Sequence, residues 1–310
     1  MPDTQYFTNI DGKYVKDAEA RQQLNDLEDY VESLDQPWTP LQDGYSNFWF
    51  ELTDDTLSPW LNFSAKTESA VIDWGDGSGE VALDTLTPTH TYSKAGRYVV
   101  KVKGVTGIAQ RLNTFDNTYI DTLKAVELNS EVVSLANSAF QREIGLEHAD
   151  IYNALYSMND FTYSGLRDIK YHTPLSIVAG FYMCFALKEY DCTGATEIAA
   201  GGLQYCMAMN KIILPSTVQS LGNSALGQCV RLTEVHVQAT TPPTIGTNVF
   251  VNLPSDWICY VPVGYGETYK AASGWSTYAD HILEEGQTPN RAMLAKFNSA
   301  KTDEPQDDMR

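Results

Sequence analysis

The chain has 310 residues and a formal net charge of −19, from 21 Lys and Arg residues against 40 Asp and Glu residues. This charge repels a polyanionic partner, and no basic run offers the electrostatic footprint that nucleic-acid binding requires, so we expect no nucleic-acid partner. A hydrophobic content of 43% with 11% aromatic residues favours folded, β-rich modules over disorder.

The start of the chain does not resemble a targeting segment. Residues 1–5 have neither the basic start nor the apolar core of a secretory signal, and Met1 is present. No window approaches the roughly 18 apolar residues of a membrane span. We therefore expect about two domains, without a signal peptide or a membrane span.

A helix is predicted over residues 14–35, and Pro37 and Pro40 follow it, each disfavouring helix at the preceding residue. Its apolar residues follow a short heptad pattern. Two interpretations stay open: an amphipathic helix lying on its own domain, or a short coiled coil that joins subunits. In the second, residues 1–36 anchor the chain and form a homo-oligomer, a trimer being the suspected form. The residues expected to make the contact are Ala20, Leu24, Leu27, Val31 and Leu34.

Residues 45–104 alternate between apolar and other side chains, as half-buried strands do. Two motifs lie in this segment: Asp-Trp-Gly-Asp-Gly at residues 73–77, and His-Thr-Tyr at residues 90–92, followed by Lys-Ala-Gly at residues 94–96. Together they resemble the signature of a PKD domain, and this resemblance implies a β-sandwich of the immunoglobulin-like class.

The two aspartates of the first motif, Asp73 and Asp76, have two possible roles. Two carboxylates fall short of the roughly six to eight oxygen ligands that calcium takes, so they do not predict a calcium site. Gly75, Asp76 and Gly77 instead favour a tight turn, because glycine adopts positive φ and aspartate caps its own backbone. We therefore expect no metal here.

One short phrase, apolar-x-x-apolar-x-apolar, recurs six times between residues 123 and 237. Its first residues are separated by 23, 20, 21, 22 and 23 residues, and a period in the low twenties is typical of a leucine-rich-repeat solenoid. Each phrase predicts a short strand whose apolar residues point inward, so that stacked repeats bury one continuous core. The first to sixth repeats begin at Leu123, Leu146, Leu166, Leu187, Met209 and Leu232.

A second phrase, Leu-x-Asn-Ser-Ala, follows the strand phrase in the first repeat and returns in the fifth, where Leu-Pro-Ser precedes it. These features resemble leucine-rich repeats of the BspA-like family. The resemblance implies a solenoid over residues 105–238 and a closing module over residues 239–285. Residues 286–310 are polar and predict a flexible acidic tail. The expected fold is thus mainly β: an N-terminal helix, a sandwich, a solenoid and a C-terminal cap.

No constellation of catalytic residues is found, so we expect neither an enzyme nor a cofactor. The five histidines, at positions 90, 148, 172, 236 and 281, are scattered and have no metal-ligand spacing. The five cysteines lack CxxC spacing, and three fall at recurring apolar places in the repeats. We interpret the cysteines as small buried hydrophobic residues.

The residues between the apolar positions of each strand phrase should face away from the core and line one exposed face of the sheet. Two interpretations stay open: a solvated face with cross-strand charge pairs, or a recognition surface for a protein or a glycan. The candidate binding residues on this face are Lys124, Glu127, Glu147, Asp150, Arg167, Lys170, Lys188, Asp191 and His236.

Residues 14–21 resemble the start of many phage tail-fibre and baseplate-attached proteins, whereas PKD domains and BspA-like repeats usually belong to extracellular, adhesive proteins. These resemblances imply a non-enzymatic phage or prophage virion protein of the fibre or receptor-binding type. Its N-terminus would bind other virion proteins, and its repeats would contact a host-surface protein or glycan after host lysis. The alternatives are a bacterial cell-surface adhesin with leucine-rich repeats, and an intracellular protein-binding scaffold.

Overall fold

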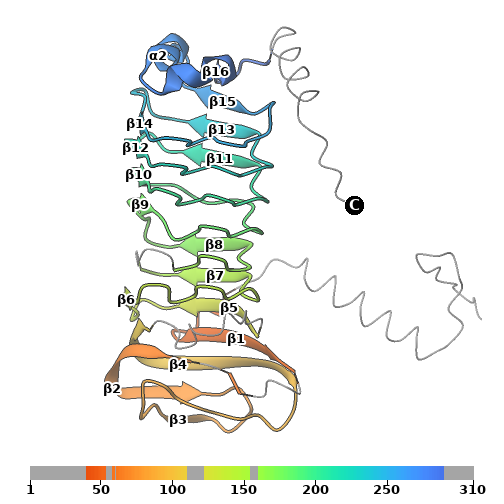
Figure 1. Ribbon diagram of the computed structural model, residues 1–310. Helices are drawn as coiled ribbons and strands as arrows, with labels where there is room; N and C mark the ends of the chain where they lie inside the picture. Colours follow the sequence, from red (N-terminus) through yellow and green to blue (C-terminus); the bar gives the residue numbers. More distant parts are fainter. Residues whose placement is uncertain (1–39, 54–57, 60, 110–121, 154–159, 290–310) are drawn as a thin grey trace, which may run out of the picture. The chain divides into compact units, whose positions relative to one another are not determined.

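The computed structural model describes residues 40–53, 58–59, 61–109, 122–153 and 160–289. The predicted helix over residues 14–35, with its heptad residues Ala20, Leu24, Leu27, Val31 and Leu34, lies outside the described residues. Most of the predicted tail, residues 290–310, also lies outside them. What is described is mainly β (Figure 1).

Four antiparallel strands form the first part of the described chain, in the order β3-β2-β4-β1. Alternating residues of β1 and β4 point into the core, where Phe48, Phe50 and Val100 are buried, as the period of two predicts. The strands are β1 (Ser46–Leu52), β2 (Phe63–Asp73), β3 (Glu80–Ala82) and β4 (Gly96–Ile108).

The second edge of β1 pairs with the first strand of the repeats, β5 (Leu123–Leu128), so that Asn47 lies opposite Glu127. All described strands within residues 45–104 lie in this one sheet, and the two facing sheets of the predicted sandwich are not shown among them. The physical consequence is that β1 covers a strand edge of the solenoid that would otherwise be exposed.

The repeats then stack in parallel, with a strand at five of the six predicted phrases. Residues 187–192 of the fourth repeat form no strand, so the prediction is wrong there. Strands β7 (His148–Ile151) and β8 (Asp168–Tyr171) continue the sheet from β5, which places Glu127, Asp150 and Lys170 side by side. Two further sheets complete the array, in the orders β14-β12-β10-β9 and β11-β13-β15-β16. The remaining strands are β6 (Ser134–Leu135), β9 (Ile177–Val178), β10 (Glu197–Ile198), β11 (Lys211–Leu214), β12 (Ser220–Leu221), β13 (Glu234–Val237), β14 (Thr244–Ile245), β15 (Ile258–Val261) and β16 (Ile282–Glu284).

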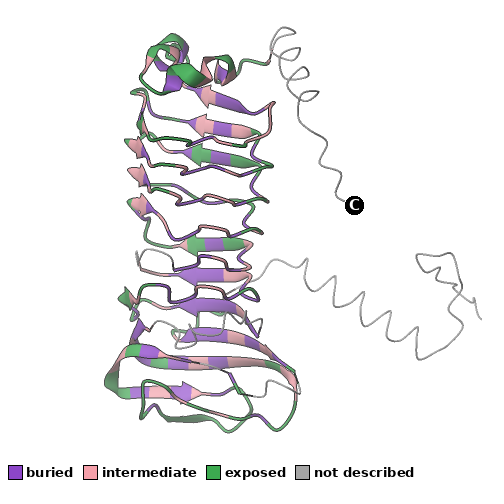
Figure 2. Cartoon of the chain, in the orientation of Figure 1, coloured by how far each residue is buried: buried purple, intermediate pink, exposed green. Residues whose placement is uncertain are grey.

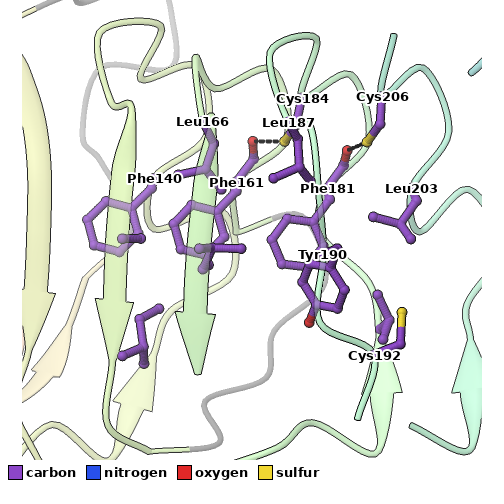
Figure 3. Packing of buried hydrophobic residues seen from close by; sticks show 14 of the residues in the cluster. Phe140, Phe161, Leu166, Phe181, Cys184, Leu187, Tyr190, Cys192, Leu203 and Cys206 are labelled. Carbon is purple, nitrogen blue, oxygen red and sulfur yellow. Dashed lines mark hydrogen bonds between the residues drawn. The ribbon is translucent and has the colours of Figure 1, made fainter. Parts of the chain in front are cut away.

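Equivalent side chains of successive repeats meet inside the solenoid, where the buried residues lie (Figure 2). The rings of Phe140 and Phe161 are stacked with centroids 5.4 Å apart, and those of Phe161 and Phe181 with centroids 5.7 Å apart. The predicted inward position of the leucines is confirmed, because Leu166 and Leu187 are fully buried beside these rings (Figure 3).

Three cysteines occupy one further column of the core. Each thiol donates a hydrogen bond to a carbonyl oxygen of the preceding repeat: Cys184 to Phe161 at 3.1 Å and Cys206 to Phe181 at 3.4 Å (Figure 3). Cys229 donates likewise to Leu203 at 3.2 Å. All five cysteines are buried and unbridged, which confirms their interpretation as small buried hydrophobic residues. Burial raises the pKa of the Cys184 and Cys229 thiols to about 12.

One corner of the solenoid is built on a left-handed backbone. The same position in each repeat has a φ between 56° and 65°, although none of these residues is glycine. This conformation turns the chain before the next strand phrase and costs free energy that the surrounding stack offsets. The corner residues are Arg142, Tyr163, Met183, Tyr205, Gln228 and Asn252.

Residues after β14 close the far end of the stack (Figure 1). The helix α2 (Gly266–Ala271) and the 3₁₀ helix η1 (Trp275–His281) bring two aromatic side chains into the core, Tyr269 and Trp275, both fully buried. The Tyr269 hydroxyl donates to the Ala239 carbonyl at 2.7 Å, and Trp275 Nε1 donates to the Pro243 carbonyl at 2.8 Å. These bonds fix the helices over the last strands.

Candidate recognition surface

The outer face of the repeat sheet is the candidate site, and its residues form columns because the strands are in register. One column runs through Asn47, Glu127, Asp150 and Lys170. The sequence predicts that Glu127 and Asp150 are exposed, and this prediction is wrong: they are only 1% and 2% exposed. They are therefore structural residues of the described fold.

Glu127 is buried with hydrogen-bond donors from a distant part of the chain. Its carboxylate accepts hydrogen bonds from the amides of Leu41 at 3.0 Å and Gln42 at 2.9 Å, and from the Asn47 side chain at 2.9 Å. Three donors replace the water that the charged group has lost. The segment before β1 thus binds across the outer face of β5.

Asp150 has a different partner. His172 Nε2 lies 2.6 Å from Asp150 Oδ1, and the imidazole stacks on the Tyr152 ring with centroids 4.1 Å apart. In the neighbouring column, His148 Nδ1 lies 2.7 Å from Asp168 Oδ2. His148 and His172 are therefore carboxylate partners across adjacent repeats.

A second column of candidates consists of cross-strand charge pairs. Lys124 Nζ lies 3.9 Å from Glu51 Oε2, and Arg167 Nε lies 3.1 Å from Glu147 Oε2. This geometry agrees with the interpretation of a solvated face for these residues. Half-exposed pairs of this kind contribute roughly 0–1 kcal/mol each to stability.

The last candidate, His236, is held between two carboxylates and an aromatic ring. Its Nδ1 lies 2.7 Å from Glu285 and its Nε2 lies 3.2 Å from Glu234, while the imidazole stacks on Tyr260 with centroids 4.8 Å apart. The hydrogen bond from His236 lowers the pKa of Glu234, with Lys211 lowering it further. His236 therefore orders the face of β13 and β15.

Three candidates are exposed, Lys170, Lys188 and Asp191, and the Arg167 side chain is 41% exposed. Within the described residues, neither Lys170 nor Lys188 has an ion-pair partner. Arg167, Lys170 and Lys188, which we call the basic trio, come from the third and fourth repeats. Lys170, Lys188 and Asp191 are the candidates that the structure leaves exposed, and Arg167 is half-exposed in its pair with Glu147.

An open groove lies on the same face, between β11 and the strand phrase of the fourth repeat. Its cavity volume is about 490 Å³, within the usual range for ligand sites of roughly 300–1,000 Å³. The strand phrase of the fourth repeat reads as a regular strand, and its one departure is Tyr190, where the other repeats have a smaller side chain. The residues that line it are Glu189, Tyr190, Asp191, Cys192, Thr193, Lys211, Ile212, Ile213, Pro215 and Gln238.

The aspartates of the first motif adopt the turn roles that were predicted. Asp73 accepts a hydrogen bond from the Gly75 amide at 2.9 Å, and Asp76 accepts one from the Ser78 amide at 3.0 Å. The Ser78 hydrogen bonds lower the pKa of Asp76, and His90 lies 2.9 Å from its other oxygen. Among the described residues, no group of three or more His, Cys, Asp or Glu side chains is arranged to hold a metal.

The helices that the structure describes are too short or too polar to cross a bilayer.

Comparison with known proteins identifies the repeats. A family model described as "BspA type Leucine rich repeat region" matches residues 109–189 and 178–256, with six copies. The predicted BspA-like repeats are therefore confirmed. The comparisons do not show the PKD or tail-fibre resemblance, and no curated protein matches the chain.

One solved structure that is similar is a leucine rich cell surface protein from Faecalibacterium prausnitzii A2-165. It is 18% identical, with a TM-score of 0.38, and the alignment covers 75% of this chain. The chain spans 58% of that protein's length, which is less than two thirds.

Proposed function

We propose that this chain, whose residues 109–189 and 178–256 are leucine-rich repeats of the BspA type, is a non-enzymatic, adhesin-like surface protein. It would bind its partner through the outer face of the third and fourth repeats. The observation that carries this proposal is the basic trio, Arg167, Lys170 and Lys188, on a chain with a net charge of −19.

The basic trio favours a partner that carries acidic groups. Elsewhere the negative charge of the chain repels such a partner, so the trio directs it to one place on the sheet. Arg167 directly precedes β8, Lys170 lies on it, and the Lys188 amide donates to the Arg167 carbonyl at 3.4 Å. Three long cations on these neighbouring repeats can therefore contact one carboxylate-bearing chain. A guanidinium also binds a carboxylate through two parallel hydrogen bonds. The expected partner is a host-surface protein or glycan with carboxylate groups.

Binding is favoured over catalysis by the state of the reactive groups. The carboxylates Asp150 and Asp168 are each held by a histidine, and Glu147 is held by Arg167. A thiol with its pKa raised to about 12, such as Cys184, is neutral near pH 7 and does not act as a nucleophile. We therefore propose recognition without chemistry, and without a cofactor.

The proposal is tested by replacing the basic trio. The triple variant Arg167→Ala, Lys170→Ala and Lys188→Ala should lose binding on a glycan array or to host cells by about tenfold, since three contacts of roughly 0.5 kcal/mol sum to about 1.5 kcal/mol and tenfold is about 1.4 kcal/mol. A control triple with the same charge change, at Lys66, Lys94 and Lys103, should bind as the wild type does. Equal binding by both triple variants would exclude this face as the site.

The attachment of the protein is a finer proposal. We propose that residues 1–36 form a homo-oligomer, a trimer being the suspected form, and bind other virion proteins. The chain would then be a component of a virion outside the cell. The support is the resemblance of residues 14–21 to tail-fibre and baseplate-attached proteins. The alternative is a bacterial cell-surface adhesin. Light scattering on the full chain and on a chain lacking residues 1–36 tests this, and a monomer in both would argue against the anchor.

A further inference from the structure

The repeat sheet is interrupted at the fourth repeat. Strand β8 is the last strand of one sheet and β11 is the first strand of the next, so each has a ladder partner on one side only. The strand phrase of the fourth repeat, residues 187–192, lies between them in sequence and forms no strand. Within the described residues, no backbone hydrogen bond joins residues 189–192 to either β8 or β11.

The rest of the fourth repeat is stacked normally. On one side β10 pairs with both β9 and β12. At the corner, the Phe181 amide donates to Gly202 at 3.1 Å, and the Leu203 amide donates to Ala225 at 3.0 Å. The interruption is therefore confined to the outer sheet and is not a general loosening of the repeat.

The cause of the interruption is a large ring at a position that is small or branched in the other repeats. The equivalent residues are Val126, Ala149, Ile169, Ile212 and Val235. In the fourth repeat the residue is Tyr190, which is buried with its ring 4.8 Å from that of Phe181. A tyrosine ring needs more room than a branched aliphatic side chain, so the backbone that carries it leaves the ladder.

The groove of about 490 Å³ lies at this interruption, along β11. A strand with one unpaired edge presents a row of amide and carbonyl groups that another extended chain can pair with. Ile213 lines the groove and is 46% exposed, which offers an apolar contact for an alternate side chain of such a chain.

The charges in the groove indicate the composition of the occupant. Glu189 and Asp191 both line it, and the third charged residue there, Lys211, lies 3.5 Å from Glu234 of the next strand. The groove therefore has an excess of negative charge. A basic side chain on the occupant would complement it.

We propose that an extended peptide segment carrying basic residues binds in this groove and adds a strand to the unpaired edge of β11. The backbone of β11 supplies the hydrogen bonds, while Glu189 and Asp191 select Lys or Arg at alternate positions of the segment. This inference rests on the proposed function as a binding protein, and it names a second site beside the basic trio with a peptide as its partner.

The test uses the full chain and a fluorescein-labelled peptide, Lys-Val-Lys-Thr-Lys-Val-Lys. Saturable binding by fluorescence anisotropy with a Kd below about 1 mM is expected. A peptide of the same sequence with N-methyl groups on every residue should not bind, because it has no backbone N–H left to donate to the strand edge. Hydrogen exchange should show protection of residues 211–214 on binding, with residues 234–237 unchanged.

Charge reversal provides the matched variants. Glu189→Lys with Asp191→Lys should weaken binding of this peptide at least about tenfold and should create binding of the Glu-for-Lys peptide. Glu68→Lys with Glu197→Lys makes the same charge change outside the groove and should leave both results as in the wild type. The proposal is overturned if the wild type shows no saturable binding, if the N-methylated peptide binds equally, or if residues 211–214 gain no protection.

The two proposals fail separately. Replacement of the basic trio should abolish surface binding and retain peptide binding. If the trio variant keeps its surface binding, the proposed function fails while the peptide result stands. If the peptide does not bind while the trio is needed for surface binding, the inference fails alone.

Discussion

The rings of Phe161 and Phe181 lie parallel to within 1°, with their centroids 5.7 Å apart, on two successive repeats of the solenoid. Each ring is fully buried, so each fills the space between its neighbours in the stack. Stacking of equivalent residues is the physical link by which one repeat supports the next.

Phe161→Ala should therefore lower the free energy of unfolding by about 3–5 kcal/mol, the usual loss for a buried phenylalanine. Phe161→Leu keeps most of the volume and should cost less than about 1.5 kcal/mol. Urea denaturation followed by tryptophan fluorescence measures both. Phe185→Ala is the control, because Phe185 is 47% exposed and its loss should stay within about 0.5 kcal/mol. A similar loss for Phe161→Ala and Phe185→Ala would contradict the stacking argument.

Glu127→Ala should destabilise the protein by about 2–4 kcal/mol, because it leaves the amides of Leu41 and Gln42 and the buried side chain of Asn47 without their acceptor. The same denaturation experiment measures this loss. The control is Glu147→Ala, which removes a half-exposed ion pair with Arg167 and should cost at most about 1 kcal/mol. If the two variants lose the same stability, Glu127 is not the buried anchor that its contacts indicate.

The Glu234–His236 pair predicts a contribution to stability that depends on pH. The hydrogen bond from His236 lowers the pKa of Glu234 below its ordinary value of 4.5. A lowered pKa in the folded state means that the contribution is present above the unfolded pKa and is lost as the pH falls through the folded pKa. Glu234→Gln should thus lower the Tm at neutral pH, and its difference from the wild type should shrink as the pH falls below 4.5.

The control for this titration is Glu267→Gln, because the Glu267 side chain is 91% exposed in its pair with Lys270. Its Tm should follow the wild type throughout the titration. A difference for Glu234→Gln that stays constant from neutral to acid pH would exclude the titration of Glu234 as its cause.

The buried cysteines should resist thiol reagents while the protein is folded. Burial raises the pKa of Cys184 and Cys229 to about 12 and that of Cys206 well above its ordinary value, so thiolate is scarce at pH 8. A colorimetric disulfide reagent should label none of the five cysteines before unfolding in guanidinium and all five after it. Val230→Cys is the positive control, because Val230 is 46% exposed beside Cys229 and its thiol should react at once.

The sequence predicts the repeats well because their cause is local. Each strand phrase places its leucine inward by the period of two, and Leu166 and Leu187 are fully buried as expected. The turn at Asp73 and Asp76 is also a local effect, since both side chains bond amides two residues away. Local patterns of this kind need no knowledge of distant parts of the chain.

The candidates for which exposure is wrongly predicted are buried by residues that lie far away in the sequence. Glu127 has the spacing of an exposed residue, and its burial comes from amides 85 and 86 positions earlier in the chain. Pairing of β1 with β5 likewise cannot be predicted from the alternation of apolar and polar residues in either strand. That alternation identifies the buried face of a strand and not the strand beside it. The interruption at Tyr190 did have a sequence signal, a ring among small and branched residues, although the strand phrase itself is intact.

Both strand edges at the ends of the repeat array are occupied, by β1 against β5 at one end and by β16 against β15, with α2 and η1, at the other. A repeat added at either end would have to displace one of these elements and rebuild its contacts. A repeat duplicated beside β7 would find a partner for each of its two edges, as β7 does between β5 and β8. The fold therefore permits the length of this array to change in evolution by internal duplication or deletion, with both closing elements kept.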